Sequence, residues 1–164
     1  MTDSKAVKPI PVEYHTVTPQ LTCKDASRAI EFYKNVFGAN EVSRFTGPDG
    51  KVMHAEIKIG DSRIMINDEF PGMASAPVAN SNGSFSLFLY VADVDSVFDK
   101  AVKAGSKSLM PVSDQFWGDR FGKVTDPFGH QWGLATHVED VSKEEMQRRG
   151  QEMFSKMSKT AAHA

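Results

Sequence analysis

The sequence contains a single cysteine, Cys23, which excludes an internal disulfide and a cysteine-rich zinc site. It has no hydrophobic run long enough to cross a membrane, and residues 1–11 lack the apolar core of a signal peptide. Neither sign of charge dominates, because 19 Lys and Arg oppose 21 Asp and Glu, so nucleic acid is a poor candidate partner. We therefore expect a cytoplasmic protein with no membrane or nucleic-acid partner, in which residues 1–11 form a flexible leader.

Periodic patterns in residues 12–69 predict a β-α-β-β-β module. Residues 15–23 alternate between apolar and polar side chains, which is typical of a half-buried strand. Asp25 is placed to act as the N-cap of a helix that ends near Phe37, where Gly38 provides a C-terminal stop. Three further segments have the pattern of strands: residues 41–45, 52–59 and 63–67.

The same order of elements returns after a linker over residues 70–83, which contains several Gly and Pro residues. Residues 85–91 alternate, and Asp93 is placed to cap a helix that ends near Ala104. A strand over residues 108–112 follows, and then a hairpin in which Asp126-Pro127-Phe128-Gly129 forms the turn between residues 120–125 and 131–136.

This internal repeat predicts an α+β fold, made of two tandem βαβββ modules within one domain over residues 12–140. We expect the strands to surround a shared cup, with the helices outside and the polar strand faces lining the concave side. A pocket with aromatic and Met surface and a few polar groups suits a small organic ligand. The predicted ligand-binding residues are Thr18, Gln20, His54, Glu56, Met65, Asn67, Ser86, Phe88, Trp117 and Arg120.

Several of these residues have competing interpretations. Trp117 either contacts the ligand or is buried as core, whereas the alternation of its strand assigns Trp132 to the core. Arg120 either clamps an anionic group or forms an ion pair with Asp119 that fixes the loop. His54 and Glu56 are the only well-placed candidates for a general acid or base, and an ordinary polar pair is the alternative.

A final helix is predicted from Ser142, with Glu145 three residues later completing a capping box. Its apolar stripe consists of Met146, Met153, Phe154 and Met157. The stripe either packs on the same domain or forms the contact of a homodimer, since Met-rich surfaces adapt to varied partners. An interaction module that uses this helix is therefore a further possible function.

The motifs together resemble the vicinal oxygen chelate superfamily, which includes glyoxalase I, extradiol dioxygenases and bleomycin-resistance proteins, and most closely its PhnB-like branch. The resemblance covers about residues 12–146. Besides the repeat and the Asp126 turn, it is carried by Thr18-Pro19, residues 29–33, 37–39, 54–56, 60–62 and 117–120, and the tail at residues 136–141.

The resemblance implies four metal-ligand positions, which fall on Thr18, Met65, Ser86 and Gly133 in this sequence. Hydroxyls bind divalent ions weakly, thioethers prefer soft metals, and Gly offers no side chain, so we expect no metal and no other cofactor. Gly133 is expected to leave open space instead. We therefore predict metal-free binding or sequestration of a small molecule, and the alternative is a metal-dependent lyase, isomerase or dioxygenase of the glyoxalase type.

Overall fold

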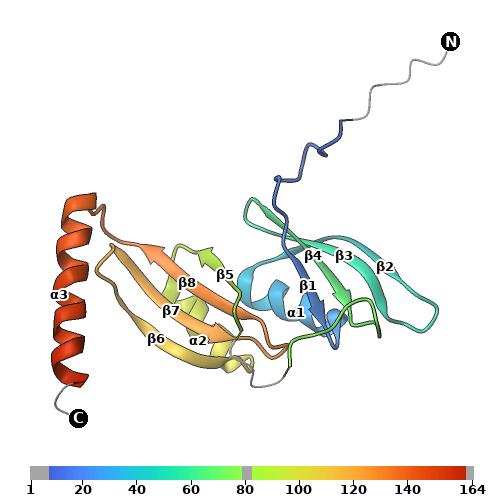
Figure 1. The fold of residues 1–164 in the computed structure, drawn as a ribbon. Coiled ribbons are helices and arrows are strands. Elements are labelled where there is room, and N and C mark those ends of the chain that lie inside the picture. Colours follow the sequence, from blue (N-terminus) through green and yellow to red (C-terminus); the bar gives the residue numbers. More distant parts are fainter. Residues whose placement is uncertain (1–7, 79–82, 162–164) are drawn as a thin grey trace. The chain divides into compact units, whose positions relative to one another are not determined.

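The computed structural model describes residues 8–78 and 83–161 (Figure 1). The first module contains β1 (Gln20–Cys23), α1 (Ala26–Phe37), β2 (Asn40–Thr46), β3 (Val52–Ile59) and β4 (Ser62–Asp68). Its four strands form one sheet in the order β1-β4-β3-β2, in which β1 and β4 are parallel and the other pairs are antiparallel.

The second module repeats this topology with β5 (Ser86–Tyr90), α2 (Val94–Lys103), β6 (Lys107–Asp114), β7 (Asp119–Thr125) and β8 (Gln131–His137). Its sheet has the order β5-β8-β7-β6, with β5 and β8 parallel. The predicted α+β fold with a doubled βαβββ module is therefore confirmed. The last element is the helix α3 (Lys143–Ala161).

The chain divides into two compact units, which we describe separately. The first unit contains the first module together with residues 127–130, and the second unit contains the rest of the second module and α3. A cup shared by both modules therefore stays a prediction, as does their grouping into one domain. Part of the predicted linker, residues 79–82, lies outside the described residues.

The two module helices begin and end where their capping residues predict. The Asp25 side chain accepts a hydrogen bond from the Arg28 amide at 3.0 Å, and Asp93 accepts one from the Ser96 amide at 3.1 Å. Gly38 has the left-handed conformation with φ of 68°, a conformation that costs Gly little because it lacks a Cβ atom. Local side-chain chemistry therefore fixes the two helices at matching places in the repeat.

Each unit has a core of its own. In the first unit, Ile30 and Tyr33 of α1 are fully buried, as are Ile57 and Ile66 on the sheet. In the second unit, Trp132 is only 1% exposed, and its indole N–H donates to the Asp126 carboxylate at 2.8 Å. The assignment of Trp132 to the core is confirmed, and the opposite face of each sheet is left for other contacts.

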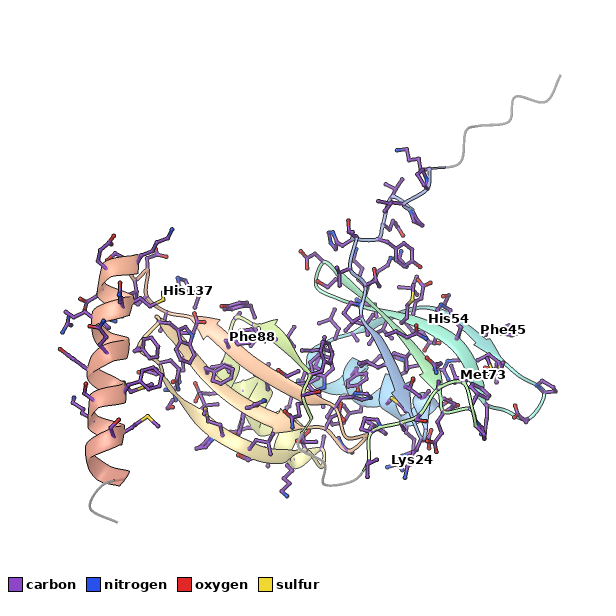
Figure 2. All side chains as sticks on the ribbon, viewed as in Figure 1. Lys24, Phe45, His54, Met73, Phe88 and His137 are labelled. Atoms are coloured by element: carbon purple, nitrogen blue, oxygen red, sulfur yellow. The ribbon has the colours of Figure 1, made fainter. Side chains whose placement is uncertain are left out.

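Strand boundaries and facing differ from the predictions at three places. β1 begins at Gln20 rather than residue 15, because Pro19 has no amide hydrogen to donate to a neighbouring strand. Val17, which precedes the strand, is exposed. Alternation along residues 52–59 predicts that Met53 lies on the same side as Ala55, but Met53 is exposed, since the β2–β3 register shifts between Phe45 and Thr46. Phe45 itself is exposed (Figure 2). Phe85 is also exposed, because it lies before the first paired residue of β5.

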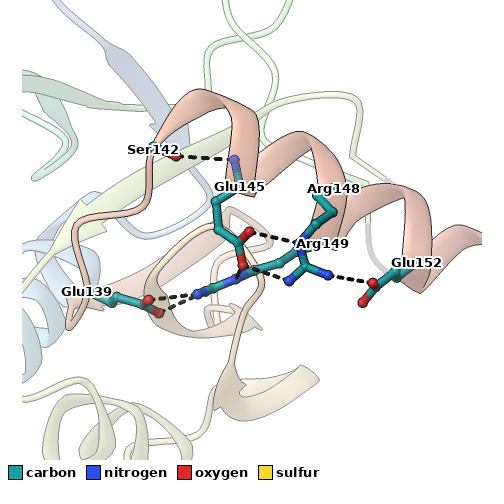
Figure 3. A network of polar contacts seen from close by, with 6 residues as sticks. All are labelled: Glu139, Ser142, Glu145, Arg148, Arg149 and Glu152. Atoms are coloured by element: carbon teal, nitrogen blue, oxygen red, sulfur yellow. Dashed lines mark hydrogen bonds and ion pairs between the residues drawn. The ribbon is translucent and has the colours of Figure 1, made fainter.

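The start of α3 is capped by Ser142, whose hydroxyl accepts from the Glu145 amide at 3.2 Å. The Glu145 carboxylate does not complete the predicted capping box but pairs with Arg148 and Arg149 (Figure 3). Those two arginines hold the pKa of Glu145 down at about 2. Arg149 also pairs with Glu139 at 2.8 Å, which attaches the helix to the segment that follows β8.

The apolar side of α3 is only partly covered. Gly150 lies against the ring of Phe116, and Phe116, Met146 and Phe154 line a pocket of about 390 Å³. Phe154 and Met157 remain exposed. Packing of α3 on its own unit is therefore partial, and a homodimer contact through this stripe stays a prediction. Among the described residues, no helix is both long and apolar enough to span a membrane.

Candidate functional site

The second unit carries a group of aromatic side chains on the sheet face opposite α2. Phe88 pairs with Gly133 in the ladder, while Tyr90 and Phe121 both pair with Ala135, so alternation puts all three rings on one face. We call Phe88, Tyr90, Trp117 and Phe121 the aromatic face. Phe88 is 50% exposed and Tyr90 61% exposed, so this face offers apolar surface to solvent.

The rings of the aromatic face contact one another in a fixed arrangement. Phe88 and Phe121 are stacked, with ring centroids 5.4 Å apart and planes 9° apart. Tyr90 lies 5.0 Å from Phe88, and Trp117 meets Phe121 edge-on at 5.9 Å. Aromatic pairs in such geometries are worth about 0.5–1.5 kcal/mol beyond their burial, so the face is organised without a ligand.

Gly133 makes the Phe88–Phe121 stack possible. A Cβ atom at this position would lie 2.9 Å from Phe121 Cε2 and 3.0 Å from Phe88 Cδ2, closer than the rings allow. The expectation that Gly133 leaves open space is therefore wrong, because the two rings cover it.

Asp119 connects the residues at one end of the aromatic face by hydrogen bonds. This carboxylate is 2% exposed, and its Oδ2 accepts hydrogen bonds from the Tyr90 hydroxyl and the Trp117 indole N–H, both at 2.9 Å. Its Oδ1 lies 2.8 Å from Nδ1 of His137. The loop holding Trp117 is tied to the chain after β8, since the Gly118 carbonyl accepts from the amides of residues 138 and 139.

The pKa values in this group follow from those contacts. Burial pushes the pKa of Asp119 up, but the donors His137, Tyr90 and Trp117 outweigh burial and hold that pKa below its usual range. The pKa of Tyr90 is raised by its hydrogen bond to the Asp119 carboxylate. Hydrogen bonds to Asp140 and then to Asp119 raise the pKa of His137. Asp119 is therefore an ionised carboxylate at neutral pH.

Arg120 lies on the other face of the same strand. Its guanidinium pairs with Asp95 of α2 at 2.6 Å and with Asp114 of β6 at 3.0 Å. The predicted ion pair between Asp119 and Arg120 is therefore wrong, because adjacent residues of a strand point to opposite faces. Arg120 faces α2 rather than the aromatic face.

The first unit has a polar face opposite α1, and a hydrogen-bond network runs along it. Gln20 donates to the Asn67 side-chain oxygen at 2.8 Å, and the Asn67 amide group lies 3.3 Å from the Thr22 hydroxyl. Ladder pairing sets Met65 beside both Gln20 and Glu56. The predicted residues Gln20, Glu56, Met65 and Asn67 are thus brought together.

Glu56 is the centre of a second group on that face. One carboxylate oxygen lies 3.3 Å from His54 Nε2, and the other accepts from Arg63 at 2.7 Å. Arg63 also pairs with Glu13, and its guanidinium stacks on the ring of Tyr14 at 5.0 Å. His54 and Glu56 therefore form a polar pair that the N-terminal segment helps to enclose.

A pocket of about 480 Å³ lies beside this group in the first unit. Thr18 and Met65 line it together with Tyr14 and residues 9–11. The described part of the predicted leader, residues 8–11, thus contributes to a pocket wall. The sequence interpretation missed Tyr14 and this role of the leader, because the segment has no periodic pattern.

The residues present do not fit the metal site that the resemblance implies. The Thr18 hydroxyl donates to the His15 carbonyl at 3.1 Å, and Gly133 is covered by the Phe88–Phe121 stack. Both carboxylate oxygens of Glu56 already have partners. Within residues 8–78 and 83–161, no group of three His, Cys, Asp or Glu side chains is arranged to hold a metal ion.

The predicted ligand-binding residues therefore fall into two sets. Thr18, Gln20, His54, Glu56, Met65 and Asn67 belong to the first unit, and Ser86, Phe88, Trp117 and Arg120 belong to the second. Arg120 does not join the aromatic face, because it pairs with Asp95 of α2. The sequence did not predict that Phe121 belongs to the site or that Asp119 forms its hydrogen bonds there. Their signal is in the sequence, because Asp119 and Phe121 lie on the same side of the strand that carries Arg120.

Residues 14–134 match the model of the Glyoxalase/Bleomycin resistance protein/Dioxygenase superfamily. The chain belongs to this family. That membership confirms the resemblance to the vicinal oxygen chelate superfamily and accounts for the doubled βαβββ module.

Known relatives agree with this assignment. An uncharacterized protein of Mycobacterium tuberculosis is 40% identical over 135 residues, which cover 80% of this chain and 79% of that protein. The crystal structure of TioX from Micromonospora sp. ML1 is 27% identical with a TM-score of 0.58, covering 74% of this chain and 98% of TioX. A PhnB protein from Bacillus cereus, described as a putative 3-demethylubiquinone-9 3-methyltransferase, has the same fold. It is 23% identical with a TM-score of 0.60, and the match covers 74% of this chain and 99% of that protein.

Proposed function

We propose that this protein binds a small, flat organic molecule on the aromatic face of its second unit, without a metal ion. The exposed rings of Phe88 and Tyr90, held in place by Phe121, Trp117 and Asp119, carry this proposal. Large aromatic side chains exposed together lose contact with water when a ligand covers them, and a flat ligand can stack on them.

The polar groups at one end of the aromatic face favour a small molecule over a purely apolar contact. Binding sites for small molecules combine apolar surface with a few well-placed polar groups that fix orientation. The Tyr90 hydroxyl and His137, both held in place by the buried Asp119, provide such groups on this face. A metal-dependent lyase, isomerase or dioxygenase is not proposed, because the four implied ligand positions lack a suitable donor set.

Protein labelled with ¹⁵N and titrated with 2-methoxynaphthalene tests the proposal. We expect the indole N–H signal of Trp117 to shift on binding, whereas the signal of Trp132 stays in place because that side chain is buried in the core. Shifts confined to the polar face of the first unit would contradict the proposed location.

A pair of alanine variants sharpens this test. Phe88→Ala removes one ring of the stack and should weaken binding by roughly three- to tenfold, since an aromatic contact is worth about 0.5–1.5 kcal/mol. Leu109→Ala is the matched control, because Leu109 is an exposed apolar residue of β6 outside the aromatic face. Equal weakening by both variants would show that the probe binds exposed apolar surface without a site.

A further inference from the structure

His137 lies beside the aromatic face with one ring nitrogen fixed and the other directed away from the core. Nδ1 lies 2.8 Å from Oδ1 of the buried Asp119, so this nitrogen carries the proton. The same carboxylate accepts from Tyr90, which places the histidine next to the exposed ring of that tyrosine. The buried aspartate therefore selects the tautomer in which Nε2 of neutral His137 is a hydrogen-bond acceptor.

The present partner of Nε2 is weak. Asp140 lies 3.0 Å from this nitrogen, but a carboxylate only accepts, so this contact requires the protonated imidazolium and is lost when His137 is neutral. The Asp140 side chain is also fully exposed, and exposed ion pairs contribute little. The His137 side chain is itself 51% exposed, so a ligand can reach it from the solvent (Figure 2). Glu139, the other carboxylate of this segment, is engaged by Arg149. Asp140 can therefore be displaced without breaking a buried contact.

We propose that Nε2 of His137 accepts a hydrogen bond from the ligand, and that the ligand is an aromatic molecule bearing a hydroxyl group. The ring would lie over Phe88 and Tyr90, and its hydroxyl would replace Asp140 at the histidine. This inference rests on the proposed binding at the aromatic face and adds the chemical class of the ligand. A hydroxyl is required because the fixed tautomer offers an acceptor and no donor at Nε2.

Two probes with the same ring system separate this inference from the function on which it rests. 2-Naphthol has the hydroxyl, and 2-methoxynaphthalene has an ether that cannot donate. At a pH where His137 is neutral, we expect calorimetry to show roughly three- to tenfold tighter binding of 2-naphthol, the contribution of one hydrogen bond. Equal affinities would overturn the inference, whereas failure of both probes to bind would overturn the proposed function as well.

The His137→Asn variant tests the acceptor directly. The Asn amide can still donate to Asp119 in place of Nδ1, but it has no acceptor where Nε2 lies. We expect the preference for 2-naphthol over its ether to disappear in this variant. An unchanged Trp117 indole signal in the free variant checks that the loop is still in place. A preference that persists with that signal intact would overturn the inference.

The pH dependence of the preference for 2-naphthol provides a second test. Asp140 and Asp119, the two carboxylates that face His137, both raise the pKa of its imidazole, and protonated Nε2 cannot accept. The preference for 2-naphthol should therefore be absent at low pH and appear as the pH rises through that pKa. The titration is kept below about pH 9, where an aromatic hydroxyl such as that of Tyr, with a pKa of about 10, stays protonated.

Asp140→Asn should move the onset of this preference to lower pH, because it removes one of the two charges that stabilise the imidazolium. Asp114→Asn is the matched control, since Asp114 is an exposed carboxylate of the same unit that pairs with Arg120 instead. An onset that moves equally in both variants, or in neither, would overturn the role assigned to His137.

Discussion

The residue that most affects the site is Gly133, which has no side chain of its own. Its importance comes from its ladder partner Phe88, whose ring stacks on Phe121 across the space where a Cβ atom would lie. The resemblance to the vicinal oxygen chelate superfamily implies a metal-ligand position here. In this chain the absence of a side chain permits a stack of two rings.

Gly133→Ala should therefore destabilise the second unit by about 1–3 kcal/mol, the usual cost of overpacking a close contact. Either Phe88 or Phe121 must move, so binding of 2-methoxynaphthalene should weaken too. Urea unfolding followed by circular dichroism measures the first effect, and calorimetry measures the second. Gly83→Ala is the control, because a Cβ atom there meets its nearest neighbours at an ordinary 3.5 Å. Equal effects of the two changes would contradict this account of Gly133.

At the scale of elements, the residues that cap the helices were the most predictable. Asp25, Asp93 and Ser142 cap helices because a short polar side chain can accept from first-turn amides, which depends only on neighbours in the sequence. The partners of Glu145 and Arg120 were less predictable. Each of these long charged side chains reaches more than one opposite charge, and only the packed elements decide which partner is chosen.

Asp68 connects three elements of the first unit and was not singled out from the sequence. It is buried at the end of β4, and its two oxygens accept from the amides of Ala26 in α1 and Val52 in β3, both at 2.7 Å. This carboxylate thus fixes the helix to the sheet. The sequence shows only an aspartate at a strand end, which is a common turn residue.

Asp68→Ala should lower the free energy of unfolding by roughly 2–4 kcal/mol, because it leaves two buried backbone donors without a partner. Asp25→Ala, which removes an exposed cap of the same helix, should cost only about 1 kcal/mol. Urea unfolding followed by far-ultraviolet circular dichroism gives both values. A smaller effect at Asp68 than at Asp25 would show that water replaces the buried carboxylate.

At the scale of the whole molecule, the absence of a suitable metal donor set leads to a test on the intact chain. Treatment with EDTA should leave both the melting temperature and the affinity for 2-methoxynaphthalene unchanged. A metal ion held at 100 times its dissociation constant would contribute about 2.7 kcal/mol to stability, so its removal would be visible. Elemental analysis showing one tightly held Ni, Zn, Mn or Fe per chain, with a melting temperature that falls on chelation, would contradict the proposed function.

The sequence by itself determined the doubled βαβββ module, the positions of the helices and, except at positions such as Met53, which strand faces are buried. These features depend on periodicity and on capping, which act between residues close in the chain. It also identified Phe88 and Trp117 as candidates for ligand contact. Only the tertiary structure decided that Phe121 joins them, that Gly133 lies beneath the rings, and that Asp119 bonds Tyr90, Trp117 and His137 rather than Arg120. Those contacts join side chains from different strands and loops, so strand pairing and register had to be known before they could be found.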